Sequence, residues 1–439
     1  MNLSVLGLLL RPAPGQRSVL ALPIIAFGIV TTLVLTVIGG AQAFWTWTDP
    51  EAMLYQALAA IALVLLVVPL TSLGGAAARL SARRRDERLS TLRLLGVTPG
   101  GVTVATVVES VFVAAAGALI GVAGHLALSP LIGLIPFRGE PLGLPSVVLP
   151  PAMIAAVVAG ALLLAAGSGV VGLRRVVISP LGVRTRTTPP NVHWIRAVIA
   201  VAGIATAFVL IKVFPMIGGV VATIAVVAAM FALALAVLNV LGPWVLKVSA
   251  GRQLRRAERP ERLLAARLVL DAPKAAWRQV GGIAMASFMA VFAGTGVALL
   301  DTLGASDDPA SIALAEDIKT GLIITLIGSF LMVAASVGVN QASDVLDKSD
   351  LHRSLHHLGM PLETVDRARR RAIMSPLLVT AVGSAICAAA LVFPLIGIAL
   401  IVAPLSLLTI ATVLTVGIGV VWASTWATRP LLERAFAPA

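Results

Sequence analysis

Long apolar runs recur along this 439-residue chain, and they decide what it can fold into. A run of about 18 or more apolar residues is long enough to cross the ~30 Å hydrocarbon core of a bilayer as a helix. Because lipid offers no partners for backbone polar groups, only helices and closed barrels span it. The runs are continuous rather than alternating, which favours helices. The sequence therefore predicts an all-α polytopic membrane protein.

Ten membrane spans are predicted from these runs. They cover residues 18–40, 54–74, 102–126, 147–172, 197–213, 217–245, 281–300, 321–339, 375–391 and 397–422. The sixth and tenth runs exceed the length of a perpendicular crossing, which predicts a tilt. Hydrophobic residues make up 59% of the chain and charged residues 12%. Soluble domains have about half and about a quarter, so this composition excludes a soluble enzyme.

The basic residues lie almost entirely on one side of the predicted spans. With the amino terminus inside the cell, the inner segments hold the arginines of stretches 83–93, 174–186, 252–278 and 367–371. The basic residues left outside are Arg138, Lys212 and Lys319. The outer loops carry acidic residues instead: Asp49, Glu51, Glu140, Asp301, Asp307, Asp308, Glu316 and Asp317. Cytoplasmic loops are enriched in Lys and Arg, so both termini are predicted to be cytoplasmic.

This asymmetry also accounts for the net charge of +13. One basic face against an anionic leaflet is sufficient to explain the charge. We therefore expect membrane lipid, and not nucleic acid, as the partner of the basic segments.

A short motif occurs twice, each time between two spans on the predicted cytoplasmic side. Residues 88–99 read RLSTLRLLGVTP and residues 351–362 read LHRSLHHLGMPL. Three positions align at one constant offset: Leu92, Leu95 and Gly96 with Leu355, Leu358 and Gly359. Each block is typical of a short amphipathic helix that ends at a glycine. Such a helix can lie on the membrane surface or present its exposed face to a soluble partner, and the residues leave both readings open.

The first block and its surroundings resemble the FtsX/MacB-like permeases of ABC transporters. In that family a charged stretch precedes a leucine-rich segment ending in Leu-Gly-Ala/Val, and the next span opens with a glutamate. Here residues 85–97 read RDERLSTLRLLGV, and Glu109 precedes a small-residue run with Gly117 and Gly121. The stretch 174–184, RRVVISPLGVR, is similar to the tail of the family pattern. The second unit is more degenerate and has Ala372 at the position equivalent to Glu109.

The resemblance implies that the chain is not itself an enzyme. Such permeases bind a soluble ATPase through coupling helices, here about 83–95 and 348–358, so that two units engage two ATPase copies. The residues that the resemblance assigns to coupling are Arg85, Glu87, Arg88, Leu89, Leu92, Leu95, Gly96, Leu351, Leu355, Leu358 and Gly359. A P-loop needs a Gly-Lys-Ser/Thr sequence, and the chain contains no Gly-Lys pair. We expect no catalytic residue, metal or cofactor here, with ATP bound by the partner.

The resemblance also implies a layout in two FtsX-like repeats. A first anchor covers residues 1–50, unit 1 covers 51–190, two linking spans with a basic segment cover 191–280, and unit 2 with the seventh span covers 281–439. The ten spans resemble the bacitracin-resistance-type branch of these permeases. That branch carries a large external domain between the seventh and eighth spans, where this chain has only about residues 301–320.

A few residues inside or beside the spans are candidates for more than lipid contact. Glu109 is the one carboxylate well within a predicted span, where a charge is costly and marks a functional candidate. The alternative is an ion pair with a basic loop residue near the cytoplasmic end. His125 is predicted to lie at the outer interface. Three glycine sites predict close helix packing: Gly74 with Gly75, Gly117 with Gly121, and Gly281 with Gly282.

The expected function is that of a permease subunit in a bacterial cell membrane. It would move or extrude a hydrophobic or amphiphilic substrate, such as a lipid, an antimicrobial peptide or a drug. Two alternatives stay open: a proton-coupled secondary transporter that uses Glu109, and a mechanotransmission regulator of an extracellular partner.

Overall fold

The computed structural model describes residues 17–49, 51–83, 99–178, 220–303, 309–347, 354 and 357–436. Within these ranges, nine helices are long and apolar enough to cross a membrane. Each of them overlaps one of nine predicted spans, and the predicted fifth span lies outside the described residues. The prediction of an all-α polytopic membrane protein is confirmed. The fifth span and the orientation stay predictions.

The helices divide into two compact units, Met1–Arg186 with Ala305–Asp347, and Thr187–Gly304 with Lys348–Ala439. Unit 1 contains α2 (Arg17–Gln42), η1 (Ala43–Thr46), α3 (Ala52–Arg83), α5 (Pro99–Gly133), β1 (Pro136–Phe137), β2 (Glu140–Pro141), α6 (Leu144–Val147), α7 (Pro151–Ile178) and α12 (Pro309–Asp347). The eighth predicted span, in α12, thus packs against α3 and α2 of the amino-terminal part.

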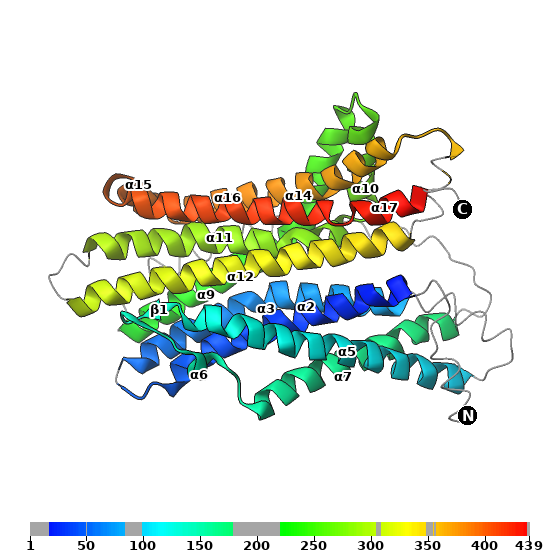
Figure 1. The fold of residues 1–439 in the computed structure, drawn as a ribbon. Helices are drawn as coiled ribbons and strands as arrows, with labels where there is room; N and C mark the ends of the chain where they lie inside the picture. Colours follow the sequence, from blue (N-terminus) through cyan, green and yellow to red (C-terminus); the bar gives the residue numbers. More distant parts are fainter. Residues whose placement is uncertain are drawn as a thin grey trace. The chain divides into compact units, whose positions relative to one another are not determined.

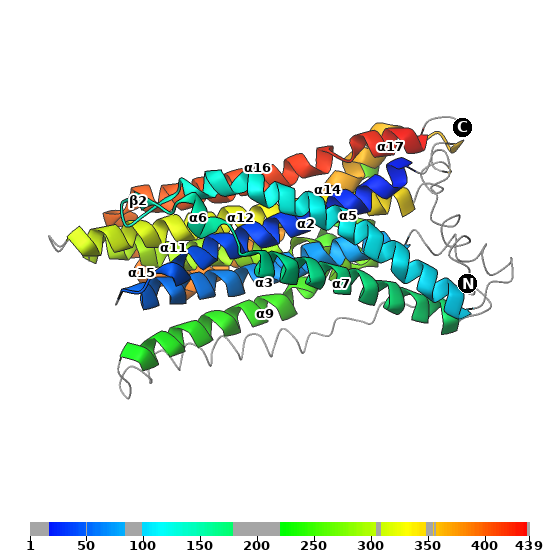
Figure 2. The same cartoon turned by 60° about the horizontal axis from the view of Figure 1, so that its bottom comes forward.

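The most extensive contact in unit 1 joins α2 and α5, which lie side by side in Figures 1 and 2. Glycines permit this approach. A Cβ atom at Gly117 would lie 2.6 Å from the Cβ of Phe27 and 2.7 Å from the backbone oxygen of Ile24. A Cβ at Gly121 would overlap the Cβ of Thr31. The predicted packing role of Gly117 and Gly121 is confirmed.

At the other two glycine sites the structure describes one glycine of each pair, and neither lies in such a seam. A Cβ at Gly74 would meet no described atom within 4 Å, so Gly74 itself makes no close helix contact, and the packing of Gly75 stays a prediction. A Cβ at Gly281 would lie 3.2 Å from the ring of Trp277, four residues earlier in the same helix. Gly281 therefore makes room for a neighbour on its own helix.

Unit 2 is built around a buried central helix. Its elements are α9 (Val220–Arg255), α10 (Pro260–Asp271), α11 (Pro273–Leu303), α14 (Leu362–Leu391), α15 (Phe393–Val402), α16 (Pro404–Trp426) and α17 (Arg429–Phe436). Helix α11 contacts α9, α14, α15 and α16, and its residues 281–290 are all buried. The end of α9 and α10 pack against each other as a helical hairpin, green in Figure 1.

Two sequence expectations need correction. The tenth span is not one tilted helix, because α15 ends at Val402 and α16 begins at Pro404. Proline lacks the N–H that a continuing helix needs and disfavours the helical conformation in the preceding residue. Ala403 accordingly has φ −133° and ψ 56°. The predicted outer loop 301–320 is largely helical, since α11 continues to Leu303 and α12 begins at Pro309.

Candidate functional site

We call the segments predicted to form coupling helices, about 83–95 and 348–358, the first and second coupling blocks. Most of the predicted coupling residues lie outside the described part of the chain. These are Arg85, Glu87, Arg88, Leu89, Leu92, Leu95 and Gly96 in the first block, and Leu351 and Leu355 in the second. The structure describes α3 up to Arg83 and α5 from Pro99, so the first block falls between these two helices. Its role in coupling stays a prediction.

The end of the second block is described. The N–H of Leu358 donates to the carbonyl oxygen of Ser354 at 3.1 Å, which closes one helical turn. Gly359 follows with φ +82°, a left-handed conformation that favours glycine and ends helices. This is the helix end that the sequence predicts. The Leu358 side chain is 83% exposed, so the turn presents an apolar group at its surface.

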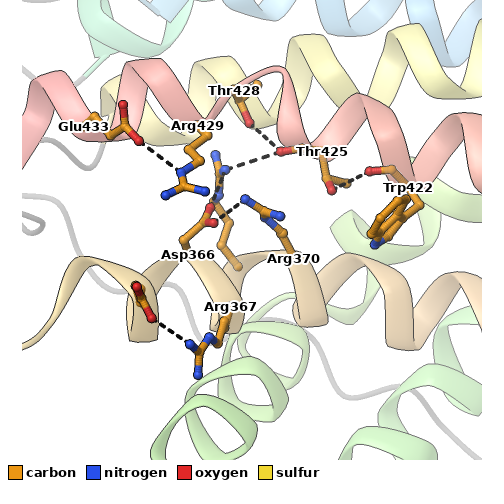
Figure 3. Close-up of polar contacts among 10 residues, drawn as sticks. Asp366, Arg367, Arg370, Trp422, Thr425, Thr428, Arg429 and Glu433 are labelled. Carbon is orange, nitrogen blue, oxygen red and sulfur yellow. Dashed lines mark hydrogen bonds and ion pairs between the residues drawn. The ribbon is translucent and has the colours of Figure 1, made fainter.

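A buried ion cluster follows this turn in the sequence and lies in the first turns of α14 (Figure 3). Asp366 accepts a hydrogen bond from Arg369 at 3.0 Å and forms a second ion pair with Arg370. The three side chains are 10%, 7% and 11% exposed. Arg369 also donates to the carbonyl oxygen of Thr425 at 3.5 Å, and the guanidinium carbon of Arg370 lies 3.4 Å from the centroid of the Trp426 ring. We call these five residues the Asp366 cluster, and it ties the start of α14 to the end of α16.

The cluster continues into the short helix α17. The hydroxyl of Thr428 donates to the carbonyl oxygen of Thr425 at 3.1 Å, and Arg429 pairs with Glu433 at 3.0 Å (Figure 3). Helix α17 also contacts α14. The first turns of α14, which follow the second block in the sequence, are therefore connected to both α16 and α17.

The charge pattern of the sequence groups the arginines of 367–371 with the basic residues of the inner segments, and the structure places them in different surroundings. Arg367 is exposed and pairs with Glu363 at 2.6 Å, whereas Arg369 and Arg370 are buried on Asp366. The spacing in the sequence indicates this pairing. Asp366 lies three residues before Arg369 and four before Arg370, so the three side chains share one face of a helix. Val365 and Ala368, buried beside Asp366, place that face inward.

A second polar cluster lies at the opposite end of α3 and α5 from the first coupling block. Arg138, at the tip of the β1–β2 hairpin, donates two hydrogen bonds to Asp49 at 2.7 and 3.0 Å. Its guanidinium carbon lies 4.1 Å from the ring centroid of Trp47 and 4.5 Å from that of Tyr55. The backbone N–H of Arg138 donates to Asp317 at 3.0 Å, and the Tyr55 hydroxyl donates to the same carboxylate at 2.7 Å. We call these five residues the outer polar cluster.

This arrangement gives two of the predicted outer acidic residues a common partner. Arg138, which the charge pattern leaves on the acidic side, gathers Asp49 and Asp317 around one hairpin. The hydrogen bonds and charge of Arg138 lower the pKa of the Asp49 carboxyl below its usual value. The Asp49 carboxylate in turn raises the pKa of Arg138. The cluster joins the connection between η1 and α3, and the first turn of α3, to the early turns of α12.

The lowered pKa of Asp49 predicts a pH dependence. The ion pair stabilises the fold at pH values above the unfolded pKa of about 4, and this contribution is lost as the pH falls through the lowered pKa. We expect Arg138→Gln to reduce the steepness with which thermal stability falls between about pH 5 and pH 3. The control is Glu140→Gln, an exposed carboxylate of the same hairpin. Identical pH profiles of wild type and Arg138→Gln, measured by thermal unfolding, would contradict the ion pair.

Glu109 and His125 both lie on α5. Glu109 is half-buried in the first turn of the candidate span Val107–Gly133, near the end that adjoins the first coupling block. Its role stays a prediction. His125 is fully buried, and its predicted position at the outer interface stays a prediction. Helix α5 continues to Gly133, beyond the predicted end of the span at residue 126, and a Cβ at Gly39 of α2 would lie 3.0 Å from the His125 ring.

Comparison with known proteins identifies one domain. Residues 78–181 match the family of FtsX-like permease C-terminal domains. Neither the curated proteins nor the solved structures gave a significant match. The matched segment runs from the end of α3 through the first coupling block, α5 and the hairpin into α7. The chain is therefore a multi-pass helical protein of the bacterial cell membrane that carries an FtsX-like permease domain, the domain of ABC transporter permeases.

Proposed function

We propose that this chain is the membrane-spanning subunit of an ABC transporter that moves a hydrophobic or amphiphilic substrate. A cytoplasmic ATPase, in two copies, binds at the two coupling blocks and supplies the energy. The match of residues 78–181 to the FtsX-like permease domain carries this proposal, because the first coupling block lies inside the matched segment.

The placement of charge supports the substrate class. In the described spans, the charged side chains lie in the end turns, as Glu109, Asp317 and Asp366 do. Apolar side chains cover the exposed faces between those ends, with Leu163 at 73% and Leu408 at 62% exposure. A substrate that enters from the bilayer needs no polar path across the membrane, whereas an ion or a sugar does.

The Asp366 cluster supplies a mechanical route for the second block. A helical turn that ends at Gly359 leads into α14, and the ion pairs of Asp366 connect α14 to α16. Interfaces of this kind transmit small shifts because packed elements move as rigid bodies. ATPase closure at the coupling blocks would thereby move the carboxyl-terminal spans.

Co-purification from gently solubilised native membranes tests the proposal. We expect a P-loop ATPase to accompany the wild-type chain, and Leu92→Asp combined with Leu355→Asp to reduce it about tenfold, the effect of losing about 1.4 kcal/mol of binding. The matched control is Ser90→Asp combined with His356→Asp, which places the same charges on the other face of each predicted helix. Equal loss in both pairs would contradict the predicted leucine contacts.

Two results would favour the alternatives. A chain that purifies alone and transports in proteoliposomes without an ATPase, with transport abolished by Glu109→Gln, would be a proton-coupled transporter. An extracellular protein crosslinked to residues 301–320, in a complex that moves no substrate, would indicate mechanotransmission.

A further inference from the structure

A cavity in unit 2 combines an apolar wall with a cationic rim. It has a volume of about 570 Å³ and lies between α9 and α11. Its lining residues are Asn239, Val240 and Pro243 of α9, and Lys274, Trp277 and Arg278 of α11. Val240 is 40% exposed, and the Lys274 and Arg278 side chains are exposed as well. The cavity is therefore accessible from the surface of the helices.

The wall of this cavity is held in place by two specific contacts. The indole N–H of Trp277 donates to the side-chain oxygen of Asn239 at 2.8 Å. The Trp277 ring lies against Gly242, where a Cβ atom would overlap the ring. Trp277 is 6% exposed in consequence. The hydrogen bond to Asn239 and the contact with Gly242 hold the Trp277 ring as the wall of the cavity between α9 and α11.

The rim carries positive charge at the start of the candidate span Pro273–Leu299. Lys274 and Arg278 are four residues apart on α11 and therefore share one helix face. The stretch from Lys247 to Arg278 contains nine basic and three acidic residues, and the acidic three, Glu258, Glu261 and Asp271, are not among the lining residues of the cavity. Buried or interfacial tryptophan beside such a rim is typical of the headgroup level of a bilayer.

We propose that this cavity binds the phosphate group of an anionic phospholipid from the inner leaflet. Arg278 and Lys274 contact the phosphate oxygens, Arg as a bidentate donor and Lys as a point charge. Val240, Pro243 and the Trp277 ring contact the glycerol and the first methylene groups of the acyl chains. Basic pockets between membrane helices on the cytoplasmic side suit such headgroups. This site is separate from the coupling blocks and does not depend on the partner ATPase.

Native mass spectrometry of the full chain, released from detergent with added lipid, tests the site. The probes are phosphatidylglycerol, phosphatidylcholine and inorganic phosphate. We expect Lys274→Gln combined with Arg278→Gln to lower the preference for phosphatidylglycerol over phosphatidylcholine about twenty-fivefold, because each basic residue near the surface contributes about fivefold. The control, Arg262→Gln combined with Arg267→Gln, removes the same charge from exposed positions of α10 and should change the preference little.

A third variant distinguishes lipid binding in the cavity from attraction of lipid by diffuse surface charge. Val240→Trp fills the cavity and leaves both cations in place, so it should also reduce binding of phosphatidylglycerol. An unchanged preference in Val240→Trp, or an equal loss in the α10 control, would overturn the proposal. If inorganic phosphate binds in a manner that depends on Lys274 and Arg278, and no lipid binds selectively, the proposal of a lipid ligand would be overturned. The cavity would then be a site for free phosphate.

Discussion

Asp366→Ala should lower the free energy of unfolding by about 3–5 kcal/mol, the cost of removing one partner from a buried ion pair. The two arginines that bind Asp366 are 7% and 11% exposed, so they cannot turn to water without displacing their neighbours. Removal of the carboxylate leaves both cations side by side among α14, Thr425 and Trp426. The expected result is a marked drop in the thermal unfolding temperature of the purified chain, measured by its tryptophan fluorescence.

The same helix provides the control for this prediction. Glu363→Ala removes the ion pair with Arg367, in which both side chains are about two-thirds exposed. An exposed pair four residues apart on a helix contributes about 0.3–0.5 kcal/mol. Comparable shifts for Asp366→Ala and Glu363→Ala would mean that the Asp366 cluster is solvated. The connection from the second coupling block to α16 would then have to run through apolar packing alone.

The existence of the spans was predictable, but their ends were not. A continuous apolar run is sufficient to indicate a membrane helix, as the runs in α11 and α12 do. The run ends where polar side chains begin, whereas backbone hydrogen bonds continue beyond that point. Helix α5 thus covers Pro99–Gly133 although its apolar run suggests 102–126, and this extension places His125 inside the α2–α5 contact.

Long-range polar contacts were less accessible to sequence reasoning than local ones. Asp366 and its two arginines lie within five residues of each other, so helical spacing alone could have paired them. Arg138 is 89 residues from Asp49 and 179 from Asp317. The charge pattern placed all three on one side of the membrane, but only the folded hairpin brings them together.

Gly121→Ala and Gly160→Ala are the same chemical change in two helices of unit 1, and their effects should have opposite signs. A Cβ at Gly121 would overlap Thr31 and lie 3.0 Å from the backbone oxygen of Gly28, so α2 would have to move. Overpacking of this kind costs about 1–3 kcal/mol. A Cβ at Gly160 of α7 would meet no described atom within 4 Å. There, alanine should stabilise the helix by up to about 0.8–1.0 kcal/mol, its advantage in helix propensity.

Thermal unfolding of these variants distinguishes the effect of helix packing from that of helix propensity. A third variant, Gly121→Ala combined with Thr31→Gly, is measured beside the two. The second substitution removes the two atoms closest to the new methyl group, so part of the lost stability should return. If Gly121→Ala is as stable as the wild type, α2 does not lie against α5 as described. Gly117 and Gly121 belong to the segment that matches the FtsX-like permease domain, whereas α2 precedes that segment. Loss and recovery of stability along this seam would therefore show that α2 is packed as an integral helix of the permease domain.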